Sequence, residues 1–196
     1  MAQQIMGYQY LLANQYDTYD HWREFCLTHG INVDFSHGNQ CWDVPALLYF
    51  QYGLRFYTGN GYAYGTWTIM RDANAKLPFI KVGDDNLSAM ERKTLIKRGD
   101  IIVFSAGGLN YTGHVGFADS DYTGDIMPIL GQNQGQGSAH GTPSNIVNWN
   151  LSRFLGAFRN TNWQQTPTPQ PVVSSKRSEN KFPFVLYADK LRNQRK

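Results

Sequence analysis

The sequence predicts an α+β domain in which N-terminal helices pack on an antiparallel β-sheet. Apolar residues recur at helical spacing in the first third of the chain. After Gly99 they form short runs separated by turn residues, as in antiparallel strands. Helices followed by strands in this order are typical of the α+β class. A composition with 41% hydrophobic and 17% charged residues fits a folded chain.

The length of 196 residues suits one domain with a sizeable core and an appendage. We expect the domain over residues 1–162, a proline-rich linker over 163–175 and a short basic tail over 176–196. Three prolines close together in the linker favour an extended chain. The tail is too short to fold by itself.

The net charge of +3 is unevenly distributed, because the tail holds seven basic and two acidic residues and thus carries +5. A basic tail can bind a polyanion, and simple solvation is the alternative. The expected partner of the tail is an anionic wall polymer or a virion subunit rather than nucleic acid. No basic and then apolar leader opens the chain, and no long apolar run predicts a membrane span.

The first predicted helix covers Gln15 to Gly30, with Asp17 or Asp20 as its cap. Cys26 lies on the apolar stripe of this helix, so we expect it in the core. Two cysteines in the whole chain are too few for a disulfide scaffold, and free thiols are expected.

The second predicted helix covers Cys41 to Tyr52 and follows a polar loop over Ile31–Gln40. Proline is tolerated in the first turn of a helix, so Pro45 indicates a start near Cys41. The thiol is then expected at the positive end of the helix dipole, with Asp43 in the first turn.

The remaining elements follow from shorter patterns. A loop is expected over 53–65, a short helix over 66–77 and a mixed polar segment over 86–98. The predicted strands are Phe79–Val82, Ile101–Phe104, His114–Ala118, Met127–Leu130, Asn145–Asn150 and Phe154–Phe158.

Three residues far apart in the chain supply the groups of a thiol hydrolase. Cys41 opens a helix, His114 opens a strand and Asn133 follows the next strand. A thiol attacks only as thiolate, which requires a nearby imidazole or a helix N-terminus. The imidazole in turn needs a hydrogen-bonding neighbour that fixes its tautomer. The Cys41 backbone N–H and the Gln40 side chain are the candidate oxyanion hole.

Four ordered blocks of sequence carry a family resemblance. They are Val33-Asp34-Phe35 ahead of Gly38-Asn39-Gln40-Cys41-Trp42-Asp43, then Arg98-Gly99-Asp100 with the following strand, Gly113-His114-Val115-Gly116-Phe117, and Leu130-Gly131-Gln132-Asn133-Gln134. In these blocks the chain resembles the CHAP family of cysteine- and histidine-dependent amidohydrolases and peptidases, related to NlpC/P60 and papain-like enzymes.

The resemblance implies a papain-like fold and a peptidoglycan hydrolase, commonly a bacteriophage lysin. Such an enzyme cuts the amide between muramic acid and L-alanine or a bond of the peptide. Cys41 is then the nucleophile, His114 the general base and Asn133 the residue that orients the imidazole. A lysin without a signal peptide is made in the host cytoplasm and reaches the wall through a holin or in a virion.

The chain departs from many relatives at Gly131, where a glutamate often stands. Without that carboxylate, the orientation of His114 is expected to rest on Asn133. A non-catalytic virion or wall-binding module with a vestigial domain is the alternative function, and a host cysteine protease is a third.

A calcium site is a further hypothesis, because some members of this family bind calcium in the loop before the cysteine. The catalytic chemistry itself requires no cofactor. The candidate oxygen ligands, at positions 1, 3, 5, 7 and 12 of an EF-hand-like loop, are Asn32, Asp34, Ser36, Gly38 and Asp43. The loop has only two carboxylates and lacks the glycine of position 6, so the alternative is that Asp34 and Asp43 cap backbone groups.

Overall fold

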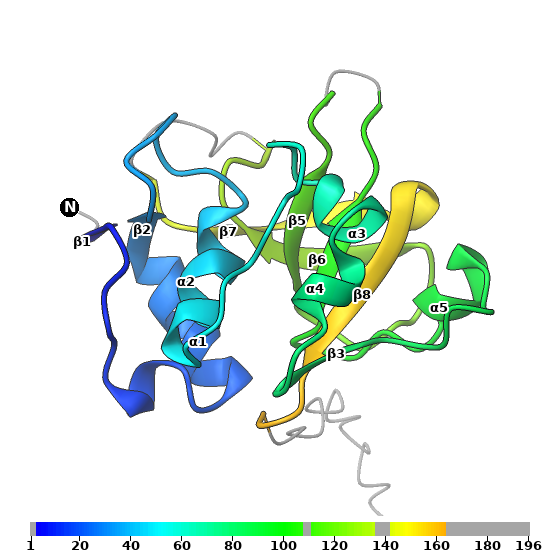
Figure 1. Cartoon of the computed structure of the whole chain (residues 1–196), viewed down its shortest axis with the longest axis horizontal. Helices are drawn as coiled ribbons and strands as arrows, with labels where there is room; N and C mark the ends of the chain where they lie inside the picture. The colour runs from blue at the N-terminus through cyan, green and yellow to red at the C-terminus, as the bar shows by residue number, and fades with distance from the viewer. Residues whose placement is uncertain (1–2, 108–110, 136–141, 164–196) are drawn as a thin grey trace, which may run out of the picture.

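The computed structural model describes residues 3–107, 111–135 and 142–163, and the expected linker from 164 onward and the tail lie outside them. The α+β prediction is confirmed: helices of the N-terminal half lie beside an antiparallel sheet (Figure 1). The helices are α1 (Tyr19–Thr28), α2 (Asp43–Gln51), α3 (Gly65–Thr68), α4 (Arg71–Asn74) and α5 (Ala89–Lys93).

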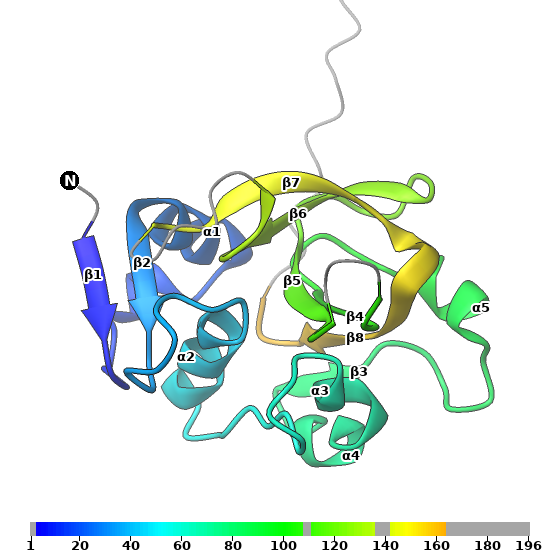
Figure 2. The ribbon, with the colours of Figure 1, turned by 90° about the horizontal axis from the view of Figure 1, so that it is seen from above.

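Within the described residues, the main sheet has six strands in the order β3-β8-β4-β5-β6-β7, with every pair antiparallel. These strands are β3 (Phe79–Lys81), β4 (Ile101–Phe104), β5 (His114–Ala118), β6 (Ile126–Gly131), β7 (Asn145–Asn150) and β8 (Phe154–Asn160). Figure 2 shows the sheet curving, with β7 passing over β6 and the chain returning to β8 beside β4. The predicted strands are confirmed, most of them to within two residues.

A second, parallel pair of strands lies at the N-terminal edge and consists of β1 (Gln3–Met6) and β2 (His29–Asn32). The predicted first helix is too long at its C-terminal end, because residues 29–32 form a strand that pairs in parallel with β1. It is also too long at its start. Thr18 caps α1 by accepting from the His21 backbone N–H at 3.2 Å, and Asp17 instead contacts the His21 ring.

The core has two layers because side chains of a strand alternate between its faces. Ile101 and Val103 of β4 pack with the residues of α1 and α2, whereas Ile102 and Phe104 pack on the opposite face. Cys26 is fully buried among the first set, as predicted. Both faces of β4 and β5 are buried, so the site at the start of β5 stands on a rigid support.

Trp163 corrects the expected start of the linker. Its side chain is buried, its indole N–H donates to the Tyr16 carbonyl at 2.9 Å, and its ring packs beside Tyr19. The domain thus includes residue 163. Within the described ranges, no helix has the length and apolar character needed to cross a bilayer.

Candidate functional site

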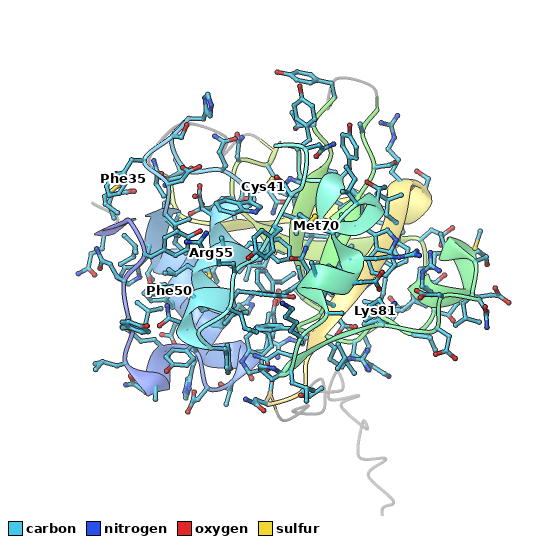
Figure 3. All side chains as sticks on the ribbon, viewed as in Figure 1. Phe35, Cys41, Phe50, Arg55, Met70 and Lys81 are labelled. Carbon is cyan, nitrogen blue, oxygen red and sulfur yellow. The ribbon has the colours of Figure 1, made fainter. Side chains whose placement is uncertain are left out.

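Cys41 lies two residues before the start of α2, because Trp42 is the helix cap and Asp43 is the first helical residue. The predicted start is therefore two residues early, but the thiol still lies at the N-terminal end. Figure 3 shows Cys41 on the side of α2 that faces α3 and β5. The residue is partly exposed and packs on the edge of the core.

Burial dominates the electrostatics of this thiol. Close packing by protein atoms raises the pKa of Cys41 to about 11, although the backbone N–H groups of Val115, Trp42 and Cys41 act in the opposite direction. The contribution of Val115, the second residue of β5, places the start of this strand against the sulfur. At this thiol, desolvation outweighs the effect of the nearby N–H groups.

His114 is the first residue of β5 and is buried. Gly113 precedes it with φ of +72°, and a Cβ at that position would lie 2.5 Å from the Phe104 carbonyl oxygen. Only glycine fits this turn, which explains the Gly-His sequence. The His114 ring stacks on the Trp149 ring, with centroids 4.5 Å apart and planes 7° apart.

The hydrogen bond of the His114 ring is with Gln134, whose Oε1 lies 3.0 Å from Nε2. Burial lowers the pKa of His114 to about 4, and the bond to Gln134 opposes this shift. His114 is therefore a neutral imidazole at pH 7. Among the described residues, no hydrogen bond joins the ring to the Cys41 thiol, so the resting pair is not an ion pair.

Asn133 does not occupy the expected place beside the imidazole. It is an exposed residue with φ of +53°, and its Nδ2 donates to Gln40 Oε1 at 3.0 Å. The physical reason is the turn after β6. A left-handed residue there directs its own side chain outward, while its neighbour Gln134 is buried against His114.

Gln40 directly precedes Cys41 and is the candidate side-chain donor of the oxyanion hole. Its Nε2 donates to the His37 carbonyl, which uses one of the two hydrogens of that group. Gln40 and Cys41 line the same pocket of about 620 Å³. The remaining lining residues are Asp34, Ser36, His37, Trp42, Thr58, Gly61, Tyr62, Ala63, Tyr111 and Thr112.

Two of these lining residues form an aromatic wall of the pocket. The exposed rings of Tyr62 and Tyr111 meet edge to face with centroids 6.5 Å apart. Tyr62 also stacks on Tyr64. Aromatic side chains of this kind present both apolar faces and polar ends to a polar polymer.

Among the candidate calcium ligands, Asp43 is tied to the backbone of the loop before Cys41. Its two carboxylate oxygens accept from the backbone N–H groups of Val33 (3.0 Å) and Gln40 (2.6 Å), so Asp43 has the capping role of the alternative hypothesis. Burial raises the pKa of Asp43 to about 7, and the charge of Asp34 adds to the shift. Asp34 accepts from the Ser36 N–H at 2.8 Å.

The Oδ1 atom of Asn32 is buried and accepts no hydrogen bond from the residues that the structure describes. That oxygen and the repulsion between Asp34 and Asp43 fit a cation. Across residues 3–107, 111–135 and 142–163, no group of three His, Cys, Asp or Glu side chains forms a metal centre. A bound ion here therefore needs amide and backbone oxygens as well.

Gln134 and Trp149 were missed by sequence reasoning. Trp149 carries no local signal, because its contact with His114 depends on β7 folding back beside β6. The sequence signal for Gln134 is the glycine at residue 131, three residues earlier. A Cβ added to Gly131 would lie 3.2 Å from both His114 Nε2 and Gln134 Oε1. Glycine at residue 131 leaves room for another side chain at the ring.

The fold is related to that of a solved protein. It resembles the fold of an endolysin. The crystal structure of wild-type endolysin LysIME-EF1 superposes with a TM-score of 0.55 at 21% sequence identity, over 74% of this chain and 64% of that one. The chain thus matches somewhat less than two thirds of the length of that endolysin. No protein family matches the sequence, and no curated protein does.

Proposed function

We propose that the protein is a peptidoglycan hydrolase that cleaves an amide bond of the bacterial cell wall with Cys41 as nucleophile. The observation that carries the proposal is the place of Cys41, which lines an open pocket and lies against Val115, the residue that follows the buried and oriented His114. The endolysin fold supports a cell-wall substrate. The open pocket and its aromatic wall suit a polymer.

The reaction begins with two neutral groups. His114 removes the proton of the Cys41 thiol while the sulfur attacks the amide carbonyl carbon. The carbonyl oxygen becomes an oxyanion, which the Cys41 backbone N–H and the second hydrogen of Gln40 Nε2 stabilise. Asn133 holds Gln40 through its Oε1, so its role is to position the oxyanion donor rather than the imidazole.

Collapse of this intermediate breaks the C–N bond. The imidazolium of His114 gives its proton to the departing nitrogen, and an acyl thioester on Cys41 remains. Water then attacks the thioester with His114 as base, which releases the carboxylic acid and restores the thiol. Attack by the thiol and attack by water each need His114 to be neutral at the start, in agreement with its low pKa.

Calcium remains part of the proposal as a structural ion. Asn32, Asp34 and Asp43, with backbone oxygens of Ser36 and Gly38, are the ligands that would hold it. Its charge would favour the ionised form of Asp43, and its bonds to the ligands would hold the loop before Cys41 in one conformation.

The test is wall lysis by the full chain. The purified protein should clear suspensions of Gram-positive cells, and Cys41→Ala should abolish clearing while the fold is retained. Cys26→Ser is the matched thiol control, because Cys26 is buried outside the pocket. Mass spectrometry of released fragments identifies the new amino group, which separates an N-acetylmuramoyl-L-alanine amidase from an endopeptidase.

The alternative is a non-catalytic virion or wall-binding module, and the same assay distinguishes it. Such a module would bind sacculi without releasing fragments, and Cys41→Ala would bind as the unchanged protein does. Release of fragments that depends on Cys41 excludes this alternative.

A further inference from the structure

The hydrogen bonds of Gln134 fix the direction of its carboxamide. Nε2 donates to the backbone carbonyls of Ile129 (2.8 Å) and Asn145 (2.9 Å). Oε1 accepts from Trp149 Nε1–H at 2.9 Å and meets His114 Nε2 at 3.0 Å. A carboxamide has two donor hydrogens and two principal acceptor sites, so all four are used. A reversed amide would set its NH₂ against the indole N–H and its oxygen against two carbonyl oxygens.

This direction determines where His114 carries its proton. Gln134 Oε1 is only an acceptor, so the 3.0 Å contact is a hydrogen bond only if Nε2 of His114 is protonated. In a neutral imidazole the other nitrogen, Nδ1, then holds the lone pair. Nδ1 is therefore the atom that takes the proton of the nucleophile.

We propose that Gln134, held by Trp149, is the positioning residue that keeps His114 in the Nε2–H tautomer required for catalysis. The inference rests on the proposed roles of Cys41 and His114. Gln134 reaches the ring because Gly131 has no side chain, since a Cβ there would stand 3.2 Å from both polar atoms of the contact. An uncharged amide thus occupies the place beside the imidazole.

Trp149 acts on both partners of this contact. Its ring lies parallel to the imidazole at 4.5 Å, and its N–H binds the same Gln134 oxygen that accepts from His114. The stacking fixes the plane of the imidazole, and the amide fixes its rotation within that plane. Together they leave one orientation of the ring.

A neutral acceptor has a consequence for pH. A carboxylate beside Nε2 would favour the imidazolium, whereas an amide favours the tautomer with little effect on charge. The elements packed against the buried His114 ring present Phe104 from β4, Gln134 from the turn after β6 and Trp149 from β7, and none of these three side chains titrates. The Cys41 thiol lies against Val115, the next residue of β5. The catalytic base should therefore stay unprotonated in moderately acidic solution.

The direct test is the tautomer of His114 in the full chain. Long-range ¹H–¹⁵N correlation spectra at pH 7, with the His114 signals assigned by comparison with His114→Gln, should show Nε2 protonated and Nδ1 bare. Gln134→Met, which keeps the size of the side chain and removes its polar atoms, should lose this tautomer preference. Asn133→Ala is the control in the same turn and should keep it.

Kinetics provide the second readout. Gln134→Met should lower kcat on the order of 10- to 100-fold, a part of the 10²–10⁴-fold supplied by proton transfer, with KM changed by about twofold or less. Gln134→Glu sets its second carboxylate oxygen against the carbonyls of Ile129 and Asn145, so it should not restore full activity. The activity that it keeps should have its acid limit moved upward by about one pH unit or more, because an ionised carboxylate favours imidazolium.

Two outcomes overturn the inference: an Nδ1–H tautomer in the unchanged protein, or a Gln134→Met variant with the unchanged tautomer and pH profile. The tautomer measurement on the unchanged protein requires neither activity nor a variant that folds. A protein with the Nε2–H tautomer but no Cys41-dependent hydrolysis would therefore refute the proposed function and leave the positioning role of Gln134 supported.

Discussion

The carboxamide of Gln132 binds both backbone polar groups of Ile31, a residue 101 positions away in the chain. Its Oε1 accepts from the Ile31 N–H at 2.6 Å, and its Nε2 donates to the Ile31 carbonyl at 2.8 Å. The same Nε2 donates to the Gln40 carbonyl at 3.1 Å. One buried side chain thus joins the turn after β6 to β2 and to the residue before the nucleophile.

Replacement of Gln132 by leucine should destabilise the fold and weaken catalysis. The change leaves the buried N–H and carbonyl of Ile31 without this partner, at a cost of about 2–5 kcal/mol in the free energy of unfolding. It also releases the backbone of Gln40 beside Cys41. Urea unfolding and wall lysis measure the two effects.

The matched control is Asn133→Ala, the adjacent exposed residue. Its free energy of unfolding should fall by about 1 kcal/mol, because alanine tolerates the left-handed φ of residue 133 less well than asparagine does. Equal stability of the Gln132→Leu and Asn133→Ala variants would show that the bridge to Ile31 is not important for the fold.

Local patterns predicted most of the sheet. Ile101–Phe104, His114–Ala118 and Asn145–Asn150 are strands with the expected bounds, because apolar runs between turn residues specify strands without long-range information. The β1–β2 pair was not predicted, since its pairing depends on Gln3–Met6 meeting a segment 26 residues later. Periodicity within a short window contains no signal for such pairing.

The site was predicted only in part for the same reason. Two reactive groups were predicted, from the Gly113-His114 sequence and from the block around Cys41. In the structure His114 begins β5, and Cys41 lies just before α2. Which amide meets the imidazole depends on the left-handed turn at Asn133, which exposes that residue and buries Gln134. Residue spacing cannot distinguish these two neighbours.

Alkylation of Cys41 should depend steeply on pH. Burial raises its thiol pKa to about 11, and only the thiolate reacts. The rate with iodoacetamide should therefore rise about tenfold per pH unit from pH 7 to near the thiol pKa. Mass spectrometry of peptides identifies the modified residue.

Cys26 is the internal control for that experiment. Its pKa is also raised by burial, and its side chain has no exposed surface, so it should remain unmodified in the folded protein. A rate for Cys41 that is already constant below pH 7 would contradict the neutral pair and indicate a preformed thiolate.

Catalysis should persist in moderately acidic solution. A free imidazole becomes protonated near pH 6.5, but burial lowers the pKa of His114 to about 4. The base is therefore lost only as the pH falls toward 4, and kcat/KM on soluble wall fragments should stay within about threefold between pH 7 and pH 5.5. A decline centred near pH 6.5 would show that His114 is solvated during the reaction.

Calcium should act through Asp43 if the loop binds it. The pKa of Asp43 is raised to about 7 in the fold, above its usual value of 3.8. The folded state therefore holds a proton that the unfolded state releases, and this group makes the fold less stable as the pH rises from 3.8 to 7. A cation beside Asp43 opposes that loss, because it favours the ionised carboxylate.

The expected result is that calcium added after chelation raises Tm more at pH 8 than at pH 5. Asp34→Asn should reduce the increase at pH 8, because it removes one candidate ligand without touching the backbone contacts of Asp43. Magnesium is the control ion, since it demands a tighter octahedral set of ligands. A Tm that calcium leaves unchanged at both pH values would refute the site, and Asp43 would then have only its role in binding the N–H groups of Val33 and Gln40.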